Sequence, residues 1–354
     1  MIKWLALALF MGLALGWGCV QFQSQPQKAP PTLLEPGLWE EFRHRFVEPS
    51  GRVVDPENAD ISHSEGQGYA MLMAEAAGDR AGFQLVWEWA ARVLWRDDHL
   101  FSWRYEPCPF EDRRCVTDHN NATDGEILIA WALLRAHARW GDADHRQAAV
   151  KIHTALLRDG LILQDGAWLI LPGREGFIEE SIVTVNGSYW VFPALEAFER
   201  HFHEPRWRQV IESGRRLLEE ARFGPYRLHA DWTDTGGPAP VPSAKFDAVH
   251  GFDAVRIPLH LAWSEDGIRR SDLRGYRDFW HDHTPPPAWI DLQGKDHAEY
   301  SRPTGMEAIA RLAAAHADSE PITADALPVP GDADGYFSWA LTLLSRIAAA
   351  ERAT

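Results

Sequence analysis

The chain has 354 residues, of which 45% are hydrophobic and 24% are charged, a composition typical of a globular protein with a large core. Its formal net charge of -16 argues against a nucleic-acid partner, because phosphate binding requires basic patches. Tryptophan is unusually frequent, at 17 residues, and its large amphipathic ring suits both a protein core and a surface that stacks on sugars.

The first 20 residues, MIKWLALALFMGLALGWGCV, combine one lysine, an apolar stretch and small residues, which is the pattern of a secretory signal. The glycine before Cys19 keeps a lipoprotein signal open, beside plain cleavage and a retained membrane anchor. Residues 21–36 form a polar, proline-rich spacer. We therefore expect a periplasmic or secreted protein whose single folded domain covers residues 37–354.

Helical patterns separated by loops fill that domain, and the clearest shows apolar residues at three- and four-residue spacing. The expected helices cover 37–47, 64–79, 82–95, 123–140, 145–159, 186–202, 205–223, 254–264, 269–282, 304–317 and 334–353. Strand signals are few, the main one being a hairpin over 161–173 around Asp165 and Gly166. Paired helices with little sheet favour a closed helical barrel or a solenoid, and no fixed-period repeat supports the solenoid. The predicted fold is all-α with minor short β-hairpins.

Two cysteines, Cys108 and Cys115, lie in one loop, PCPFEDRRC. Export implies an oxidising compartment, so we expect a local disulfide that serves as a structural staple. Two free thiols are the alternative.

The stretch SEGQGYAM begins with an apparent capping box, in which Ser64 and Gln67 satisfy the first helical amides. This places Glu65 at the first helical position, where its carboxylate points off the end of the helix. Gly66 and Gly68 are expected to leave room for a bulky ligand beside it.

A second apparent capping box, Thr123 with Glu126, places Asp124 at the start of the next strongly patterned helix. An acid in a first helical turn is usually structural, since it gains about 0.3–1 kcal/mol from the helix dipole. Glu126 is explained in this way. Two helices that each begin with a carboxylate among small residues, in an exported and tryptophan-rich chain, favour a catalytic site.

A third junction, KFDAVHGFDAVRIPL, holds Asp247 and Asp253 in near-duplicate surroundings. The stretches SEGQGYAM, LFSWRY, NNATDGEILIAWALLRAHARW and FDAVRIP resemble glycoside hydrolase family 8, from about residue 35 to the end of the chain. This family holds bacterial endoglucanases with some xylanases and chitosanases, and the likeness is greatest to the periplasmic endoglucanases of cellulose-synthesis operons. The chain departs from the family at Glu126, where the signature has Asp, and at Phe252, where a Tyr is expected.

The resemblance implies an (α/α)6 barrel and an inverting mechanism, with Glu65 as general acid and Asp253 as general base. An inverting pair stands about 6.5–9.5 Å apart so that a water fits between base and sugar. Arg256 is placed to hold Asp253 ionised, and Asp247 is the rival base. The acid has to overcome its helix dipole, which lowers a carboxyl pKa, through burial and through repulsion from Asp124.

The resemblance also implies that Asp124 binds the distorted sugar, that Trp103 stacks on the glucan and that Tyr189 lies near the water. Core packing is the alternative for both aromatic residues, and His63 is expected to be a supporting or structural residue. No metal or cofactor is expected: GDADGY at 331–336 resembles the start of a calcium loop, but Leu343 stands where a glutamate should coordinate.

These features predict an endo-β-1,4-glucanase that acts on a β-1,4-glucan chain during bacterial cellulose synthesis or export. We expect a monomer, with the cellulose synthase complex as a possible partner. The alternatives are a chitosanase or xylanase on the same fold and a glucan-binding subunit with an inactive site. A helical-barrel lyase is disfavoured, since we find no suitable set of Tyr, His or Lys bases.

Overall fold

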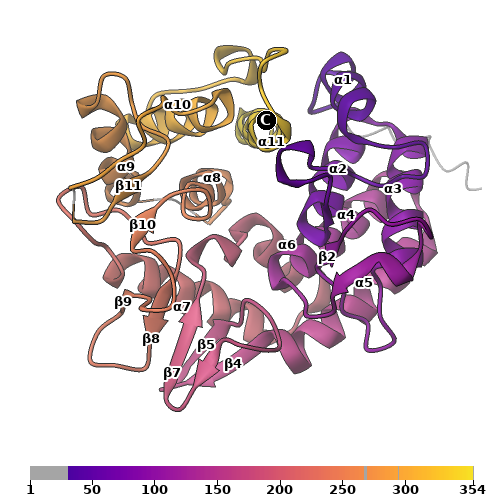
Figure 1. The fold of residues 1–354 in the computed structure, drawn as a ribbon, viewed down its shortest axis with the longest axis horizontal. Coiled ribbons are helices and arrows are strands. Elements are labelled where there is room, and N and C mark those ends of the chain that lie inside the picture. The colour runs from indigo at the N-terminus through magenta and orange to yellow at the C-terminus, as the bar shows by residue number, and fades with distance from the viewer. Residues whose placement is uncertain (1–30, 267–268, 294, 354) are drawn as a thin grey trace, which may run out of the picture. The chain divides into compact units, whose positions relative to one another are not determined.

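Eleven α-helices dominate the computed structural model, which describes residues 31–266, 269–293 and 295–353 (Figure 1). They are α1 (Pro36–Phe46), α2 (Ser64–Ala77), α3 (Arg80–Val93), α4 (Thr123–Trp140), α5 (Ala143–Ala155), α6 (Phe192–Phe202), α7 (Pro205–Glu220), α8 (Arg256–Trp263), α9 (Arg270–Asp282), α10 (Thr304–Asp318) and α11 (Tyr336–Ala353). Each expected helix is confirmed. The largest difference lies at 186–191, where a short 3-10 turn precedes α6. The expected signal, Cys19 and residues 21–30 of the spacer lie outside the described residues.

Five helices contact one another in turn and close a ring, in the order α2, α4, α6, α8 and α11, with α11 returning to α2 (Figure 1). Helices α3, α5, α7 and α9 each pack against the ring helix that precedes them in the chain. Helix α10 packs on α8, α9 and α11. Because α11 returns to α2, the helices form a closed barrel and not a solenoid.

Short strands join the helices at the ring's edge. They are β1 (Ser62–His63), β2 (Arg104–Tyr105), β3 (Val116–Asp118), β4 (Leu161–Gln164), β5 (Ala167–Ile170), β6 (Ile178–Glu179), β7 (Ile182–Val185), β8 (Thr233–Thr235), β9 (Val241–Pro242), β10 (Val249–His250) and β11 (Ile290–Asp291). The predicted hairpin is confirmed as β4–β5, with Leu161 opposite Ile170 and both turn residues, Asp165 and Gly166, at positive φ. The sheet β6-β7-β8-β9 was not predicted, because its strands are short and far apart in sequence.

Two glycines let α2 and α4 approach closely at their N-terminal ends. A Cβ on Gly68 would lie 2.6 Å from Leu128 Cβ, and one on Gly125 would lie 2.2 Å from Ser64 Oγ. A Cβ on Gly66 would lie 2.5 Å from the hydroxyl of Tyr336 on α11. The expectation that Gly66 and Gly68 clear space for a ligand is therefore wrong: they clear space for neighbouring helices, which brings the helix starts together.

The residues just before α1 also pack on the helical domain. The N–H groups of Leu33 and Leu34 donate to the carbonyl oxygen of Ala76, and Leu34 is buried. Cys108 and Cys115 form the expected disulfide, with a Cα–Cα distance of 5.5 Å.

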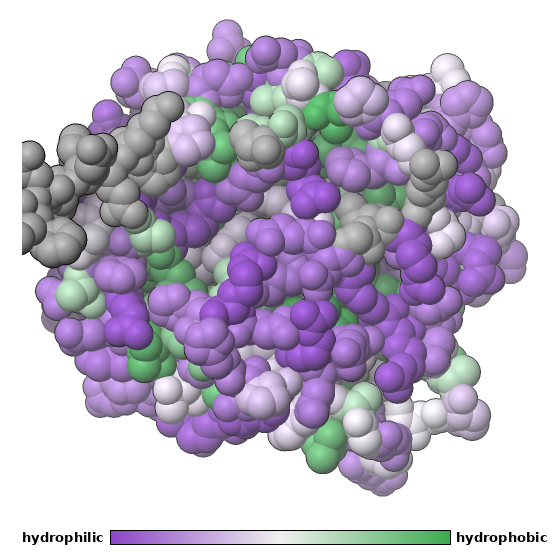
Figure 2. All heavy atoms as spheres, turned by 180° about the vertical axis from the view of Figure 1, so that it is seen from behind, coloured by the Kyte–Doolittle hydropathy of each residue, from purple (hydrophilic) through white to green (hydrophobic). Residues whose placement is uncertain are grey.

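Within the described part of the chain, no helix has the length and apolar character needed to cross a membrane. The face behind the view of Figure 1 is mostly hydrophilic where it is described, with small separate apolar spots (Figure 2).

Candidate active site

The starts of α2, α8 and α11 line a cavity of about 580 Å³. Its walls include Glu65 and Asp253, the two carboxylates expected to act, together with His63, Arg256 and Tyr336. The structure thus brings together side chains that lie almost 190 residues apart in sequence, as the 187-residue separation of Tyr69 and Arg256 illustrates.

A larger cavity of about 750 Å³ is lined by the second half of α4 and the end of α11. Its two acids are each paired with an arginine: Glu265 with Arg200 and Glu351 with Arg135. These acids are committed to ion pairs, so this cavity is the weaker candidate for acid-base chemistry.

The start of α2 is capped by His63, and the predicted Ser64–Gln67 capping box is wrong. The Nδ1 atom of His63 accepts the N–H of Gly66 at 3.1 Å. The Gln67 amide is buried between the carbonyl oxygen of Gly51 and the N–H of Val53. Since the cap falls one residue earlier than predicted, the acid at 65 lies in the second helical position.

Glu65 lies beside this cap, with its Oε2 atom 3.3 Å from the His63 Nδ1. Burial raises the pKa of the carboxyl, and a protonated His63 opposes this and lowers it below the ordinary value. The protonation of the expected acid is therefore tied to that of the neighbouring imidazole.

Asp124, at the start of α4, is fully buried and bonded to Arg256, whose Nη1 lies 2.8 Å from its Oδ2. Burial raises the pKa of Asp124 to about 7, and the charge of Glu65 adds to this rise while Arg256 opposes it. The effect of the Glu65 charge on the pKa of Asp124 shows that the two carboxyls lie close together, as expected.

Arg256 joins two of the acids, since its Nη2 contacts Asp253 Oδ1 at 2.6 Å while its Nη1 binds Asp124. The same Nη1 donates to the hydroxyl of Tyr69 at 3.0 Å. Desolvation raises the pKa of Tyr69 to about 12, so this hydroxyl stays neutral near pH 7. Asp247, the rival base, is exposed on a loop and does not line the cavity.

Asp231 holds the turn that carries Asp253, and sequence reasoning missed it. Its Oδ1 accepts the N–H of Gly251 at 2.9 Å and that of Ala254 at 2.8 Å. Burial, followed by the charge of Asp253, raises its pKa to about 7. Nothing in the local sequence could have revealed it, because the partners lie 20 and 23 residues further along the chain.

Glu126 is not a capping residue. The residue before α4 is Ala122 and makes no side-chain cap. Glu126 is fully buried, and its two oxygens accept the N–H of Phe101 at 2.7 Å and the Nδ2 of Asn121 at 3.1 Å. Burial raises its pKa to about 8, so the carboxyl is largely neutral at pH 7.

The two expected sugar contacts differ in exposure. Trp103 is half-buried, with the Arg104 guanidinium 5.6 Å from its ring centroid, and its backbone oxygen accepts the N–H of Ser64. Tyr189 is only 7% exposed and lies 5.8 Å from the Arg256 guanidinium, so it packs beside Arg256 without lining the cavity. Phe252 is 45% exposed and lines the cavity.

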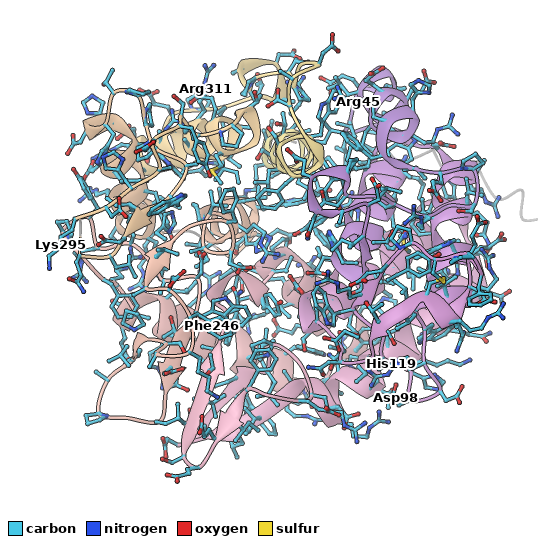
Figure 3. All side chains as sticks on the ribbon, in the orientation of Figure 1. Arg45, Asp98, His119, Phe246, Lys295 and Arg311 are labelled. Carbon is cyan, nitrogen blue, oxygen red and sulfur yellow. A yellow bond between two sulfur atoms is a disulfide. The ribbon has the colours of Figure 1, made fainter. Side chains whose placement is uncertain are left out.

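An aromatic stack that the sequence did not indicate lies next to Tyr189. Trp232 stacks on Phe177, with centroids 5.7 Å apart, and on Phe246, with centroids 4.4 Å apart. Phe246 is 42% exposed and is labelled in Figure 3 on the loop between β9 and β10. The stack borders the site through the edge contact of Trp232 with Tyr189.

No cluster of His, Cys, Asp or Glu suited to a metal ion occurs among the described residues. A helical barrel with two carboxylates, Glu65 and Asp253, in one cavity is consistent with a glycoside hydrolase, which works with such a pair as acid and base. A sequence profile of the family described as Glycosyl hydrolases family 8 matches residues 20–351. The chain belongs to this family, and the predicted (α/α)6 barrel is confirmed.

The relatives are mainly endoglucanases. A probable endoglucanase from Novacetimonas hansenii is 39% identical over 321 residues, which cover 88% of this chain and 90% of the relative. An endoglucanase from Cellulomonas uda is 36% identical over 280 residues, 77% and 76% of the two chains. Among solved structures, endo-β-1,4-glucanase CMCax from Acetobacter xylinum has a TM-score of 0.82 and 37% identity, covering 92% of this chain and 100% of its own.

Proposed function

We propose that this protein is an endo-β-1,4-glucanase that hydrolyses cellulose-type β-1,4-glucan with inversion of configuration. Membership of an inverting family supports the reaction type. The names of the relatives from Novacetimonas hansenii and Cellulomonas uda, both endoglucanases, support the substrate class.

In the proposed mechanism, Glu65 donates its proton to the glycosidic oxygen that leaves, while Asp253 accepts a proton from water. The water oxygen then bonds to the sugar carbon from the opposite face, which inverts its configuration. The observation that carries this assignment is the Arg256 guanidinium, which contacts Asp253 at 2.6 Å in the same cavity as Glu65. A charge-assisted contact of this kind holds the Asp253 carboxyl in a fixed position in the cavity.

The remaining residues would hold the sugar. Asp124 binds hydroxyls of the distorted ring at the cleavage point, and Arg256 keeps its carboxylate in place. Trp103 stacks on a glucose ring further along the chain, which its half-buried position supports. Tyr189 contacts the site close to the water, which its place beside Arg256 supports.

The proposed setting is the periplasm, where the enzyme trims glucan during cellulose synthesis or export as a monomer near the cellulose synthase complex. The pattern of the first 20 residues supports export.

Reducing-end release from carboxymethyl cellulose, chitosan and xylan by the wild type and Glu65→Gln tests the function. We expect activity on the cellulose derivative alone, its loss in the variant, and an α-anomeric first product by NMR. Activity on chitosan or xylan alone would keep the mechanism and change the substrate. Inactivity on all three would favour a glucan-binding subunit.

A further inference from the structure

His63 occupies a position that is rarely given to an imidazole, the N-cap of the helix that carries the acid. Its Nδ1 atom accepts the Gly66 N–H at 3.1 Å and lies 3.3 Å from Glu65 Oε2. Ser, Thr, Asp and Asn are the usual N-cap residues, and none of them changes charge near neutral pH. Imidazole does, since its ordinary pKa is about 6.5.

The Nδ1 atom has one lone pair, so its two contacts constrain each other. When Gly66 donates to it, Nδ1 is unprotonated, and the contact with Oε2 is favourable only if Glu65 carries a proton. When Nδ1 carries the proton, it donates to an ionised Glu65 and gives up the Gly66 N–H. In both states one proton lies between the imidazole and the carboxyl.

The electrostatics agree with this coupling. Burial lowers the pKa of His63, but the carboxylates around it, Glu65 first and then Asp55 and Asp124, together raise it above the ordinary value. The reverse holds for the Glu65 carboxyl, whose pKa is raised by burial and brought below its ordinary value by a protonated His63. Two groups that interact in this way titrate as a pair.

We propose that His63 and Glu65 act as one proton-holding unit, in which His63 keeps the acid site supplied with the proton that Glu65 delivers to the leaving oxygen. The proposal rests on the proposed function, in that Glu65 is the general acid. His63 itself does not contact the sugar in this scheme, so it is a positioning and proton-holding residue.

The proton is conserved through the cycle. A proton on Nδ1 passes to the Glu65 carboxylate, which leaves His63 neutral. Glu65 then gives that proton to the glycosidic oxygen as the bond from this oxygen to the sugar carbon breaks. The free pair takes one proton from solvent, while Asp253 returns to solvent the proton that it took from water.

Other titratable and charged groups face this pair from the surrounding elements. They are Asp55 before α2, Tyr69 on α2, Asp124 on α4, Arg256 on α8 and Tyr336 on α11. The two aspartates favour a proton on His63, and Arg256 favours an ionised Glu65. The Tyr336 ring packs edge-on against His63, with centroids 5.8 Å apart, and fixes the plane of the imidazole.

An NMR titration of the full chain tests the pair without relying on activity. The ¹⁵N shifts of the His63 imidazole would be followed against pH in the wild type and in Glu65→Gln. We expect His63 to titrate above 6.5 in the wild type and at least about one pH unit lower in the variant, with the Gly66 amide shift moving over the same pH range. An unchanged His63 midpoint in Glu65→Gln would overturn the proposal.

Enzyme kinetics supply the second test. His63→Asn keeps an N-cap acceptor and removes the titrating nitrogen, whereas His63→Ala removes both. We expect the basic limb of the kcat/KM profile to move about one pH unit lower in both variants, with a lower Tm in His63→Ala alone. An active His63→Asn enzyme with the wild-type basic limb would contradict shared proton holding and leave the proposed function intact.

Discussion

Arg256 and Asp124 form a buried ion pair, with side chains that are 7% and 1% exposed and atoms 2.8 Å apart. The other arm of the guanidinium contacts Asp253 at 2.6 Å. Removing one member of a buried pair leaves an uncompensated charge, so such pairs are costly to break. One arginine therefore couples the stability of the barrel to the geometry of two acids in the site.

Arg256→Gln is expected to lower the free energy of unfolding by about 3–5 kcal/mol at pH 8. At that pH the Asp124 carboxyl, with its pKa of about 7, is mostly ionised and would be left buried without a partner. Adding Asp124→Asn should recover part of the loss, as a double-mutant cycle by chemical denaturation would measure. If the losses of unfolding free energy in the two single variants simply add up in the double variant, Arg256 and Asp124 do not stabilise each other.

The assignment of the base is tested by a matched pair of variants. Asp253→Asn should lower kcat by about 10²–10⁴, because it removes the group that accepts the proton from water. Asp247→Asn, on the exposed loop, should stay within about threefold of the wild type, since surface changes away from such features are small. Steady-state kinetics on carboxymethyl cellulose would compare them, and the reverse ranking would move the base to Asp247.

Asp231 should matter through its hydrogen bonds to the turn that holds Asp253. Both bonds go to one oxygen, Oδ1, so Asp231→Asn can keep them while Asp231→Ala cannot. We expect kcat to fall by at least about tenfold in the alanine variant and less in the asparagine variant, because misplacing a catalytic group by 1 Å costs up to about 10². Equal kcat in the two variants would argue against a positioning role.

The sequence predicted correctly those features of the fold and site that depend on neighbouring residues in the chain. The helix at Thr123–Trp140 was predicted with both ends correct, because its apolar spacing and the glycine after it are properties of the segment itself. Glu65, Asp253 and Arg256 could be found because each belongs to a short motif at the start of a helix.

Long-range contacts account for what was missed. The spacing of Thr123 and Glu126 fits a capping box, yet Glu126 bonds to Phe101, which lies 25 residues earlier. At α2 the sequence suggested Ser64 as the cap, but the close approach of Gly125 to Ser64 and the pairing of His63 with Arg104 shift the cap to His63. The residue that caps each helix is therefore set by contacts with residues far away in the sequence, which a local pattern does not include.

Trp103→Ala should raise KM several-fold while changing Tm little. Its backbone bonds to Asn120 and Ser64 do not depend on the side chain, and the ring is half-buried. The loss should therefore fall on glucan binding, and Trp103→Phe should lose less because it keeps a stacking ring. Kinetics and thermal unfolding together would distinguish a glucan-stacking role from core packing. A large fall in Tm would mark Trp103 as a core residue.

Glu126 gives the protein a stability that falls as pH rises. Its folded-state pKa is about 8 against an ordinary 4.5, so the neutral carboxyl is favoured in the fold. That contribution is complete below about pH 4.5 and is lost as pH rises towards 8, with a slope near 1.4 kcal/mol per pH unit. Other buried carboxyls, Asp124 and Asp231 with pKa values of about 7, add to the same trend.

Glu126→Gln isolates this contribution, because it removes one titrating group while its amide oxygen can still accept the Phe101 N–H. The difference between the unfolding free energies of the variant and the wild type, measured from pH 5 to 8, should change steadily in favour of the variant. Asp124 and Asp231 are present in both proteins, so their effects cancel in that difference. Parallel curves would mean that Glu126 is ionised across this range and that its bonds to Phe101 and Asn121 outweigh the cost of burying its charge.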